Sequence, residues 1–199
     1  VTDITERKQL EETLRQSERQ YRQLYETMRD GFCITDMAGL MLQFNPAFQQ
    51  LVGYSEAELY TLHSQDITAP KWHEMEERII REQVLPRGYS DLYEKEYIRP
   101  DGGVLPVEIR TYLVTTGEGQ PMGISAFVRD ITERKWVQDR LHEANAYYRS
   151  LIEASLDPLV TITPAGKISD LNTATELMTG YFWQDLVGSY FADYFTHPD

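Results

Sequence analysis

The sequence predicts an α+β domain over residues 29–131, on the basis of three observations. Two short strand patterns open this segment, helical patterns occupy its middle, and three strand patterns with a period of two residues close it. Octets that start at residues 1 and 128, an offset of 127 residues, differ at one position, Thr2 against Arg129. Apolar residues in heptad spacing follow each octet. A single repeat of this length indicates tandem domains joined by helices, not a solenoid of short repeats.

Composition limits the function. The 199-residue chain has a formal net charge of −13, which opposes nucleic-acid binding because phosphate contacts need clustered Lys and Arg. No apolar run approaches the ~20 residues that cross a bilayer. Cys33 is the single cysteine, which excludes a disulfide framework and a cysteine-based metal site. We therefore expect a cytoplasmic location without direct membrane insertion. Because the chain starts without Met inside a repeated motif, we expect a fragment of a longer protein, which could be membrane-attached elsewhere.

Linker helices are expected at residues 9–28 and 132–155, and residues 1–8 are interpreted as the last strand end of a preceding domain. In both helices an apolar seam alternates spacings of four and three residues, with mostly polar residues between. A parallel homodimer through these seams is the favoured hypothesis because one register recurs in both copies. An amphipathic helix lying on its own domain is the alternative. The seam residues are Leu10, Leu14, Tyr21, Leu24, Val137, Leu141, Tyr148 and Leu151.

The first half of the domain is predicted to be a hairpin followed by two short helices. Residues 32–35 and 40–44 form the strands, and Asp36 bonds nearby backbone N–H groups in the turn between them. Asn45, followed by proline, is expected to cap the first helix. Ser55, with a glutamate three residues later, predicts a capping box at the second.

The second half is predicted to be one longer helix and three strands. The helix is predicted at residues 70–85. It begins at Pro70 and is ended by Pro86 and Gly88. Strands are expected at residues 92–99, 104–114 and 122–128, where apolar and polar residues alternate. The Pro-Asp-Gly-Gly sequence at residues 100–103 predicts a hairpin turn between the first two strands.

Five short motifs occur in order along this segment: Asp36-Met37-Ala38-Gly39, Phe44-Asn45-Pro46-Ala47-Phe48, Gly53-Tyr54-Ser55, Arg99-Pro100-Asp101-Gly102 and Asp130-Ile131-Thr132. As an ordered set they resemble a PAS domain of the PAS/S-box kind. The resemblance implies a five-stranded antiparallel sheet in the order 2-1-5-4-3, with helices over one face. Residues 156–199 resemble the front half of a second PAS domain, whose three later strands lie outside the sequence.

The resemblance implies a signal-sensing, dimerising module of a multidomain signal-transduction protein. A sensor histidine kinase is the favoured host, and a diguanylate cyclase is an alternative. In the family an Asp-Ile-Thr junction couples the last strand to the output helix, here Asp130, Ile131 and Thr132, with Asp3 and Thr5 as counterparts in the first octet. Short polar side chains at that place can cap free helix N–H groups. The competing hypothesis is a ligand-free structural spacer between neighbouring PAS and output domains.

A small-molecule ligand, if the domain takes one, is expected between the helices and the sheet. The candidate residues are apolar, and whether they line a cavity or simply fill the core stays open at this point. They are Phe44, Phe48, Leu51, Trp72, Met75, Ile79, Val107, Ile109, Ile124, Ala126 and Val128.

No cofactor is predicted. Haem-binding PAS domains ligate iron through a His on the longer helix, and His73 is the counterpart here, but we expect it to face solvent or to pack beside Trp72. The flavin-binding branch needs an Asn-Cys-Arg-Phe sequence, which this chain lacks. No nucleophile, base and orienting group stand at a recognisable spacing, so we expect no enzyme within these residues. A kinase or cyclase output domain is expected beyond residue 199.

Overall fold

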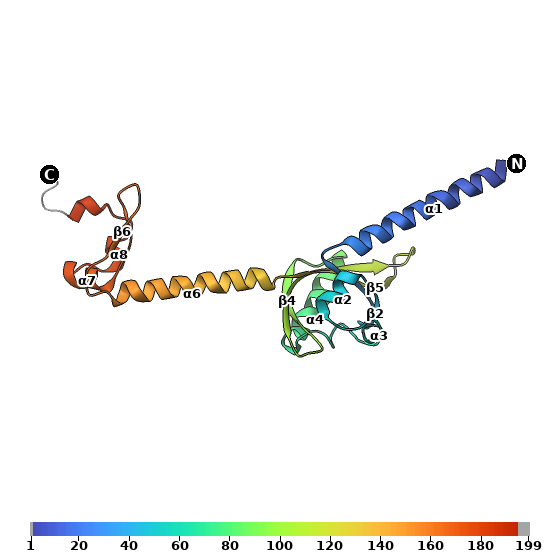
Figure 1. Cartoon of the computed structure of the whole chain (residues 1–199), viewed down its shortest axis with the longest axis horizontal. Coiled ribbons are helices and arrows are strands. Elements are labelled where there is room, and N and C mark those ends of the chain that lie inside the picture. The colour runs from blue at the N-terminus through green and yellow to red at the C-terminus, as the bar shows by residue number, and fades with distance from the viewer. Residues whose placement is uncertain (1, 195–199) are drawn as a thin grey trace. The chain divides into compact units, whose positions relative to one another are not determined.

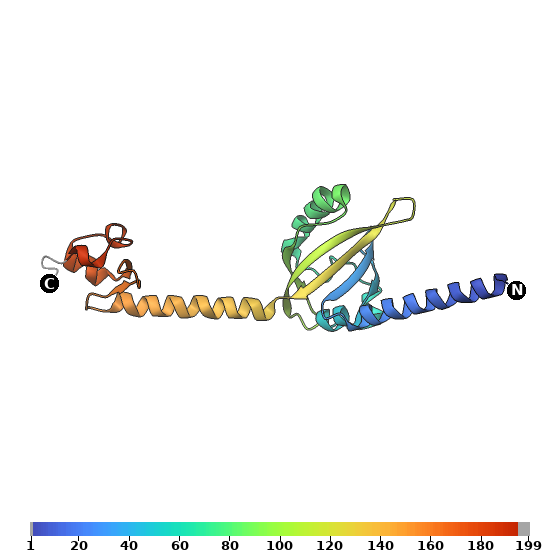
Figure 2. The same cartoon turned by 90° about the horizontal axis from the view of Figure 1, so that it is seen from above.

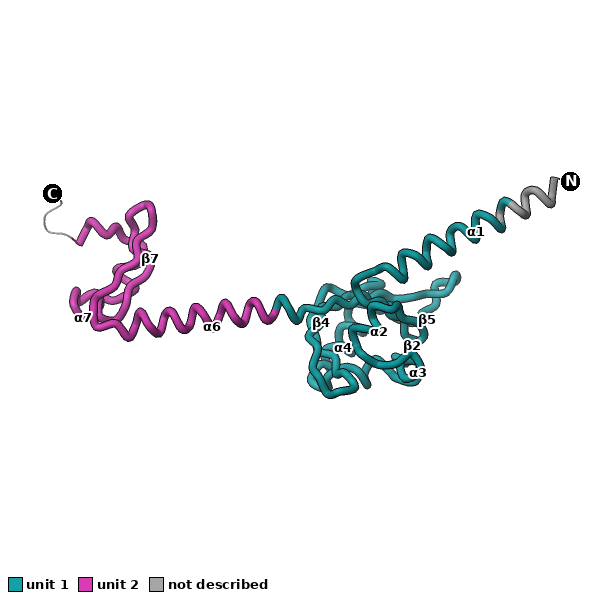
Figure 3. The backbone as a smooth tube through the Cα atoms, in the orientation of Figure 1, with its two compact units in different colours: residues 1–134 teal, residues 135–199 magenta. Residues whose placement is uncertain are grey.

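The computed structural model of the chain describes residues 2–194, and for residues 2–8 and residue 10 it describes the backbone alone. The chain divides into two compact units, residues 1–134 and residues 135–199 (Figure 3). Each unit has its own antiparallel sheet.

The first unit contains a five-stranded sheet in the order β2-β1-β5-β4-β3, as the resemblance implied. β4 and β5 are long twisted strands, and β1 lies beside β5 (Figure 2). Helices α2 (Pro46–Val52) and α4 (His73–Ile79) lie over one face of the sheet (Figure 1). The predicted α+β class and strand order are therefore confirmed. The strands are β1 (Gly31–Asp36), β2 (Met41–Phe44), β3 (Tyr93–Ile98), β4 (Val104–Thr115) and β5 (Pro121–Asp130).

The first helix begins earlier than the sequence suggested. α1 spans Thr2–Thr27, so residues 2–8 are helical where a strand end was expected. The same octet is divided in its second occurrence, because β5 ends at Asp130 and α6 (Thr132–Ala154) begins at the residue expected. Backbone polar groups need partners, and residues 128–130 find them in β4. Among the described residues no strand pairs with residues 2–8, and their backbone instead forms the bonds of a helix.

The turn and the first caps have the predicted chemistry. Asp36 Oδ1 accepts hydrogen bonds from the N–H groups of Ala38 and Leu40 at 2.8 and 2.9 Å, which closes the β1–β2 turn. A capping box begins α3 (Glu56–Leu59), where Ser55 and Glu58 bond each other's backbone N–H groups.

Asn45 caps α2 as predicted and also connects two further segments. Its Oδ1 accepts from the N–H of Phe48 at 2.8 Å and from the N–H of Phe32 at 2.9 Å. Its Nδ2 donates to the carbonyl of Asp30 at 3.1 Å. Asn45 is fully buried. One side chain therefore ties the segment that follows α1, the strand β1 and the start of α2 together.

The long helix predicted at residues 70–85 is present but changes its winding. It runs through the 3-10 turn η1 (Pro70–Trp72), α4, the π-helical segment η2 (Ile80–Val84) and α5 (Leu85–Arg87). In η2 the N–H of Leu85 bonds the carbonyl of Ile80, five residues back. Proline lacks an N–H, and its ring crowds the carbonyl four residues earlier. Pro86 therefore disfavours an ordinary α-turn at this place.

Strand alternation places the core of the first unit between the sheet and α2. Phe48 and Val52 of α2 are fully buried against it. Phe44, Leu51, Tyr54, Leu62 and Tyr93 pack around this core at half-buried positions. Its buried members are Cys33, Met41, Phe48, Val52, Leu59, Ile67, Tyr97, Leu105, Val107, Ile109, Ala126 and Val128.

The second unit repeats the opening of the first on a smaller core. Its strands β6 (Val160–Ile162) and β7 (Ile168–Leu171) pair, and α7 (Thr173–Thr179), α8 (Trp183–Leu186) and η3 (Phe191–Tyr194) follow. The counterpart of Asn45 is Asn172, which caps α7 and donates to carbonyls at the end of α6 and just beyond it. The buried apolar cluster comprises Ile168, Leu171 and Leu186, and Leu177 and Phe182 are exposed.

Candidate functional site: a cavity under the long helix

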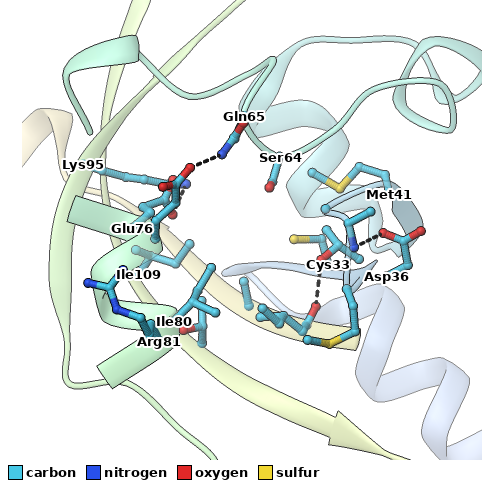
Figure 4. A pocket seen from close by; sticks show the side chains of 18 of the residues that line it. Cys33, Asp36, Met41, Ser64, Gln65, Glu76, Ile80, Arg81, Lys95 and Ile109 are labelled. Carbon is cyan, nitrogen blue, oxygen red and sulfur yellow. Dashed lines mark hydrogen bonds and ion pairs between the residues drawn. The ribbon is translucent and has the colours of Figure 1, made fainter. Parts of the chain in front are cut away.

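A cavity of about 310 Å³ lies between the sheet and the helical segment α4–η2–α5 (Figure 4). This volume falls at the lower end of the ~300–1,000 Å³ typical of small-molecule sites. Met41, Ile109 and Ile124 form part of its apolar wall, and Ile80 and Leu85 reach it from the helical segment. The π winding of η2 thus contributes directly to the cavity, as π segments frequently do at functional sites.

One wall carries a buried ion pair. Lys95 Nζ lies 2.6 Å from Glu76 Oε1, and their side chains are only 2% and 15% exposed. The ammonium group also donates to Thr68 Oγ1 at 2.9 Å and lies 4.5 Å from the centre of the Tyr97 ring. The Tyr93 hydroxyl donates to Glu76 Oε1 at 3.1 Å. Each charge thus has several partners, as a buried pair needs.

The Cys33 thiol and the hydroxyls of Tyr93 and Tyr97 in the cavity wall stay neutral at physiological pH. Burial raises the pKa of the Cys33 thiol to about 12, although the charge of Lys95 acts in the opposite direction. Burial also raises the pKa values of Tyr93 and Tyr97 well above the ordinary value. A protonated, buried thiol is a poor nucleophile. Cys33 is therefore a buried part of the cavity wall and a poor candidate for a nucleophile.

Three of the residues predicted for the pocket, Ile109, Ile124 and Ala126, line this cavity. The others lie elsewhere, because the space between α2 and the sheet is filled and the cavity opens under α4–η2. Phe48, Val107, Val128 and Ile79 are buried in the packed interior, Phe44 and Leu51 pack against the core, and Trp72 and Met75 are half-buried outside the cavity lining.

The polar wall was missed by the sequence analysis, although one pattern could have revealed half of it. Side chains of a strand alternate between faces, so Tyr93, Lys95 and Tyr97 share one face of β3. An ionisable residue between two inward-facing tyrosines indicates a buried charge that needs a partner. The partner Glu76 had no comparable signature, since charged residues surround it on the helix.

His73 does not line the cavity. Its Nε2 lies 2.9 Å from the Thr68 carbonyl and 3.1 Å from the Gln65 carbonyl. Carbonyl oxygens only accept, so this nitrogen carries the proton and ties the helix start to the preceding loop. Among the described residues no group of three or more His, Cys, Asp or Glu side chains could hold a metal ion.

The junction residues lie where the last strand becomes the outgoing helix. Asp130 Oδ1 accepts a hydrogen bond from the N–H of Thr132 at 2.7 Å. Ile131 is buried, and its N–H donates to the carbonyl of Pro106 at 3.1 Å. Thr132 is the first residue of α6. Asp130 therefore holds the helix start, and Ile131 anchors it in the edge of the core.

The apolar seams of the two helices are exposed in the single chain. In α1 the side chains of Leu14, Tyr21 and Leu24 are exposed, and in α6 so are those of Val137, Leu141, Tyr148 and Leu151. Leu10, Asp3 and Thr5 lie in α1, and their side chains are outside the described part of the structure. No helix of the described residues is both long and apolar enough to span a membrane.

Comparison with known proteins identifies two domains of one family. A family model described as "PAS domain" matches residues 29–133, and one described as "PAS fold" matches residues 146–199. The sensor histidine kinase TmoS of Ectopseudomonas mendocina is 30% identical over 129 residues, which are 64% of this chain and 13% of that protein. The aerobic respiration control sensor protein ArcB of Escherichia coli is 36% identical over 105 residues, which are 51% of this chain and 13% of ArcB. "Probable diguanylate cyclase DgcE" of Escherichia coli is 31% identical over 132 residues, 65% of this chain and 11% of that protein.

Solved structures show the same fold. A PAS domain from Colwellia psychrerythraea superposes with a TM-score of 0.54 at 21% identity and covers 58% of this chain and 97% of its own. An RNA-binding Light-Oxygen-Voltage receptor gives a TM-score of 0.53 at 20% identity, over 63% of this chain and 36% of its own. The match to residues 29–133 agrees with the observed architecture, a five-stranded sheet with helices over one face. The chain belongs to the PAS domain family and carries sensory domains similar to parts of sensor histidine kinases and of a probable diguanylate cyclase.

Proposed function

We propose that residues 29–131 form a signal-sensing module that binds a small molecule in the cavity and passes a change in β5 to α6. The observation that carries this proposal is that the strand leading to α6 also lines the cavity. β3 and β4 supply Lys95, Ile109 and Thr111 to the cavity, β5 supplies Ile124 and Ala126, and β5 ends at Asp130. Displacement of any cavity-lining residue of β5 acts on a continuous strand that leads into the helix.

The host of this module is proposed to be a multidomain sensor protein, with a sensor histidine kinase favoured over a diguanylate cyclase. The similarity to TmoS, ArcB and DgcE supports this proposal. A kinase or cyclase output domain would lie outside the present residues. The alternative role is a spacer without ligand that relays changes between neighbours, and the cavity of about 310 Å³ favours the ligand-binding role.

Replacing Asp130 with Ala is expected to weaken signalling far more than folding. The variant loses the bond to the Thr132 N–H, a local hydrogen bond worth about 1 kcal/mol, against the ~5–15 kcal/mol that holds a domain together. A bias of about 1.4 kcal/mol shifts a two-state equilibrium tenfold. The measurement is signal-dependent output of the full-length sensor beside the melting temperature of the domain. Ser55→Ala, which removes an exposed cap far from α6, is the control. A folded Asp130→Ala protein with normal output would contradict the role of this residue.

The exposed seams support a parallel homodimer through α1 and α6. Four large apolar side chains of the α6 seam are at least half exposed in the single chain, and a second copy at the same register would bury them. Light scattering is expected to give a dimer at tens of micromolar and a monomer for Leu141→Asp. Gln138→Asp changes a residue of the same helix outside the seam and should leave the dimer intact. A wild-type monomer at that concentration would refute the proposed interface.

A further inference from the structure

A row of charged residues crosses the face of the sheet that lies opposite the cavity. Glu94 of β3 pairs in register with Glu108 of β4, and Glu108 pairs with Arg129 of β5. Neighbouring residues of a strand point to opposite faces. Because Lys95 and Ile109 line the cavity, Glu94 and Glu108 point away from it.

Arg134 joins this row to the outgoing helix. From the first turn of α6, its Nη2 donates to Glu94 Oε1 at 2.8 Å and its Nη1 to Glu108 Oε2 at 2.9 Å. Two carboxylates directly opposite each other on adjacent strands repel. The planar guanidinium group satisfies both at once, which a lysine, a compact point charge, does less well. The start of α6 is thus held to β3 and β4.

Arg129 joins the other end of the row to the segment that follows α1. Its Nε and Nη2 donate to the two oxygens of Asp30 at 3.1 and 2.7 Å, a bidentate arrangement. Asp30 lies three residues beyond the end of α1, and its carbonyl accepts from the buried Asn45. The pKa of the Arg129 guanidinium is raised, first by the hydrogen bond to Asp30 and further by the charges of Asp30 and Glu108.

The sequence repeat singles out the same residue. The octets at residues 1–8 and 128–135 differ only at Arg129, whose counterpart is Thr2. The arginine is therefore a feature of the second octet alone. In the structure it is the residue through which the second octet reaches the segment after α1.

We propose that Asp30, Arg129, Glu108, Arg134 and Glu94 form an ionic strip that couples the end of α1 to the start of α6 without passing through the cavity. Arg134 is the positioning residue at the output end. The coupling is a property of residues 1–134, and its use in signalling rests on the sensory function proposed above. A molecule bound in the cavity would act on the same two strands, because the cavity-lining residues Lys95 and Ile109 are the chain neighbours of Glu94 and Glu108. Arg134 would then combine a signal from a preceding domain with one from a bound molecule.

A double-mutant cycle in the 199-residue chain tests the strip. Asp30→Asn and Arg134→Gln are made singly and together, and hydrogen exchange is measured at the amides of the first two turns of α6. Asp30 has no direct contact with Arg134 among the interactions above, so independent sites would give additive effects. Asp30→Asn is expected to speed exchange in α6 at least twofold, and this effect should vanish in the Arg134→Gln background.

Two controls distinguish coupling through the ionic strip from a general destabilisation of α6. Arg140→Gln removes an arginine of α6 that stacks on Trp136, outside the strip, and should leave the response to Asp30→Asn unchanged. Raising the salt concentration from 50 to 500 mM should weaken the response in the wild type, because exposed charges are screened. An unchanged α6 in Asp30→Asn, or an equal effect with and without Arg134, would overturn the proposal. That outcome would leave the cavity route and the Asp130 experiment untouched, since those are measured through the output of the full-length sensor.

Discussion

Lys95→Met is expected to lower the free energy of unfolding of the first unit by about 3 kcal/mol, because removal of one partner leaves a buried charge uncompensated. The Glu76 carboxylate would keep only the Tyr93 hydroxyl among the partners described above. Urea denaturation followed by Trp72 fluorescence measures the change, in a background where Trp136 and Trp183 are Phe. Trp72 then reports on the first unit alone.

A matched pair on the surface provides the control. Lys71 Nζ lies 2.8 Å from Glu96 Oε2 with the lysine side chain 61% exposed, so Lys71→Met should cost under about 1 kcal/mol. The double variant Lys95→Met/Glu76→Leu should recover most of the lost stability, since apolar replacement of a buried pair is often neutral. Equal costs for Lys95→Met and Lys71→Met would show that the buried pair does not stabilise the wall of the cavity.

Asn45→Ala is expected to cost about 3 kcal/mol of unfolding free energy. The helix cap contributes about 1 kcal/mol. The Phe32 N–H and the Asp30 carbonyl also lose their bonds to this side chain, and each unsatisfied buried group costs roughly 1–3 kcal/mol. The Asp30 carbonyl and the Phe32 N–H could bond water instead only if the end of the strand opened. The same Trp72 measurement would detect that opening.

The second unit supplies the comparison for Asn45. Asn172 makes the equivalent bonds to the ends of α6 and α7, so Asn172→Ala should loosen the second unit and leave the Trp72 transition unchanged. Ser55→Ala, which removes a cap at an exposed helix start, should cost about 1 kcal/mol. A cost for Asn45→Ala no larger than that for Ser55→Ala would mean that only its cap matters.

Local chemistry explains which elements could be predicted. Asn45 before a proline, Ser55 before Glu58, and Asp36 in a turn each act through backbone groups within a few residues, so the sequence alone shows them. The strands were predictable because their period of two residues matches one buried face. The strand order followed from the resemblance to a family rather than from any property of the residues themselves.

The site was harder to predict because it depends on distant segments. Glu76 and Lys95 are 19 residues apart, and neither one alone indicates a buried pair. Phe48, one of the aromatic residues chosen for the pocket, is buried in the packed core with α2 instead. The role of Arg134 could not be predicted for the same reason, since its partners Glu94 and Glu108 become neighbours only when β3 and β4 pair.

The π segment at Ile80–Val84 makes the shape of the cavity depend on chain length as well as on side-chain identity. Removing one residue from it would turn every upstream residue by about 100° relative to Leu85. Glu76 could then no longer face Lys95 while Leu85 kept its place. A family member with the same residues but one fewer in this turn would thus have a different interior, whereas most substitutions at exposed positions of the helix would leave the cavity as it is.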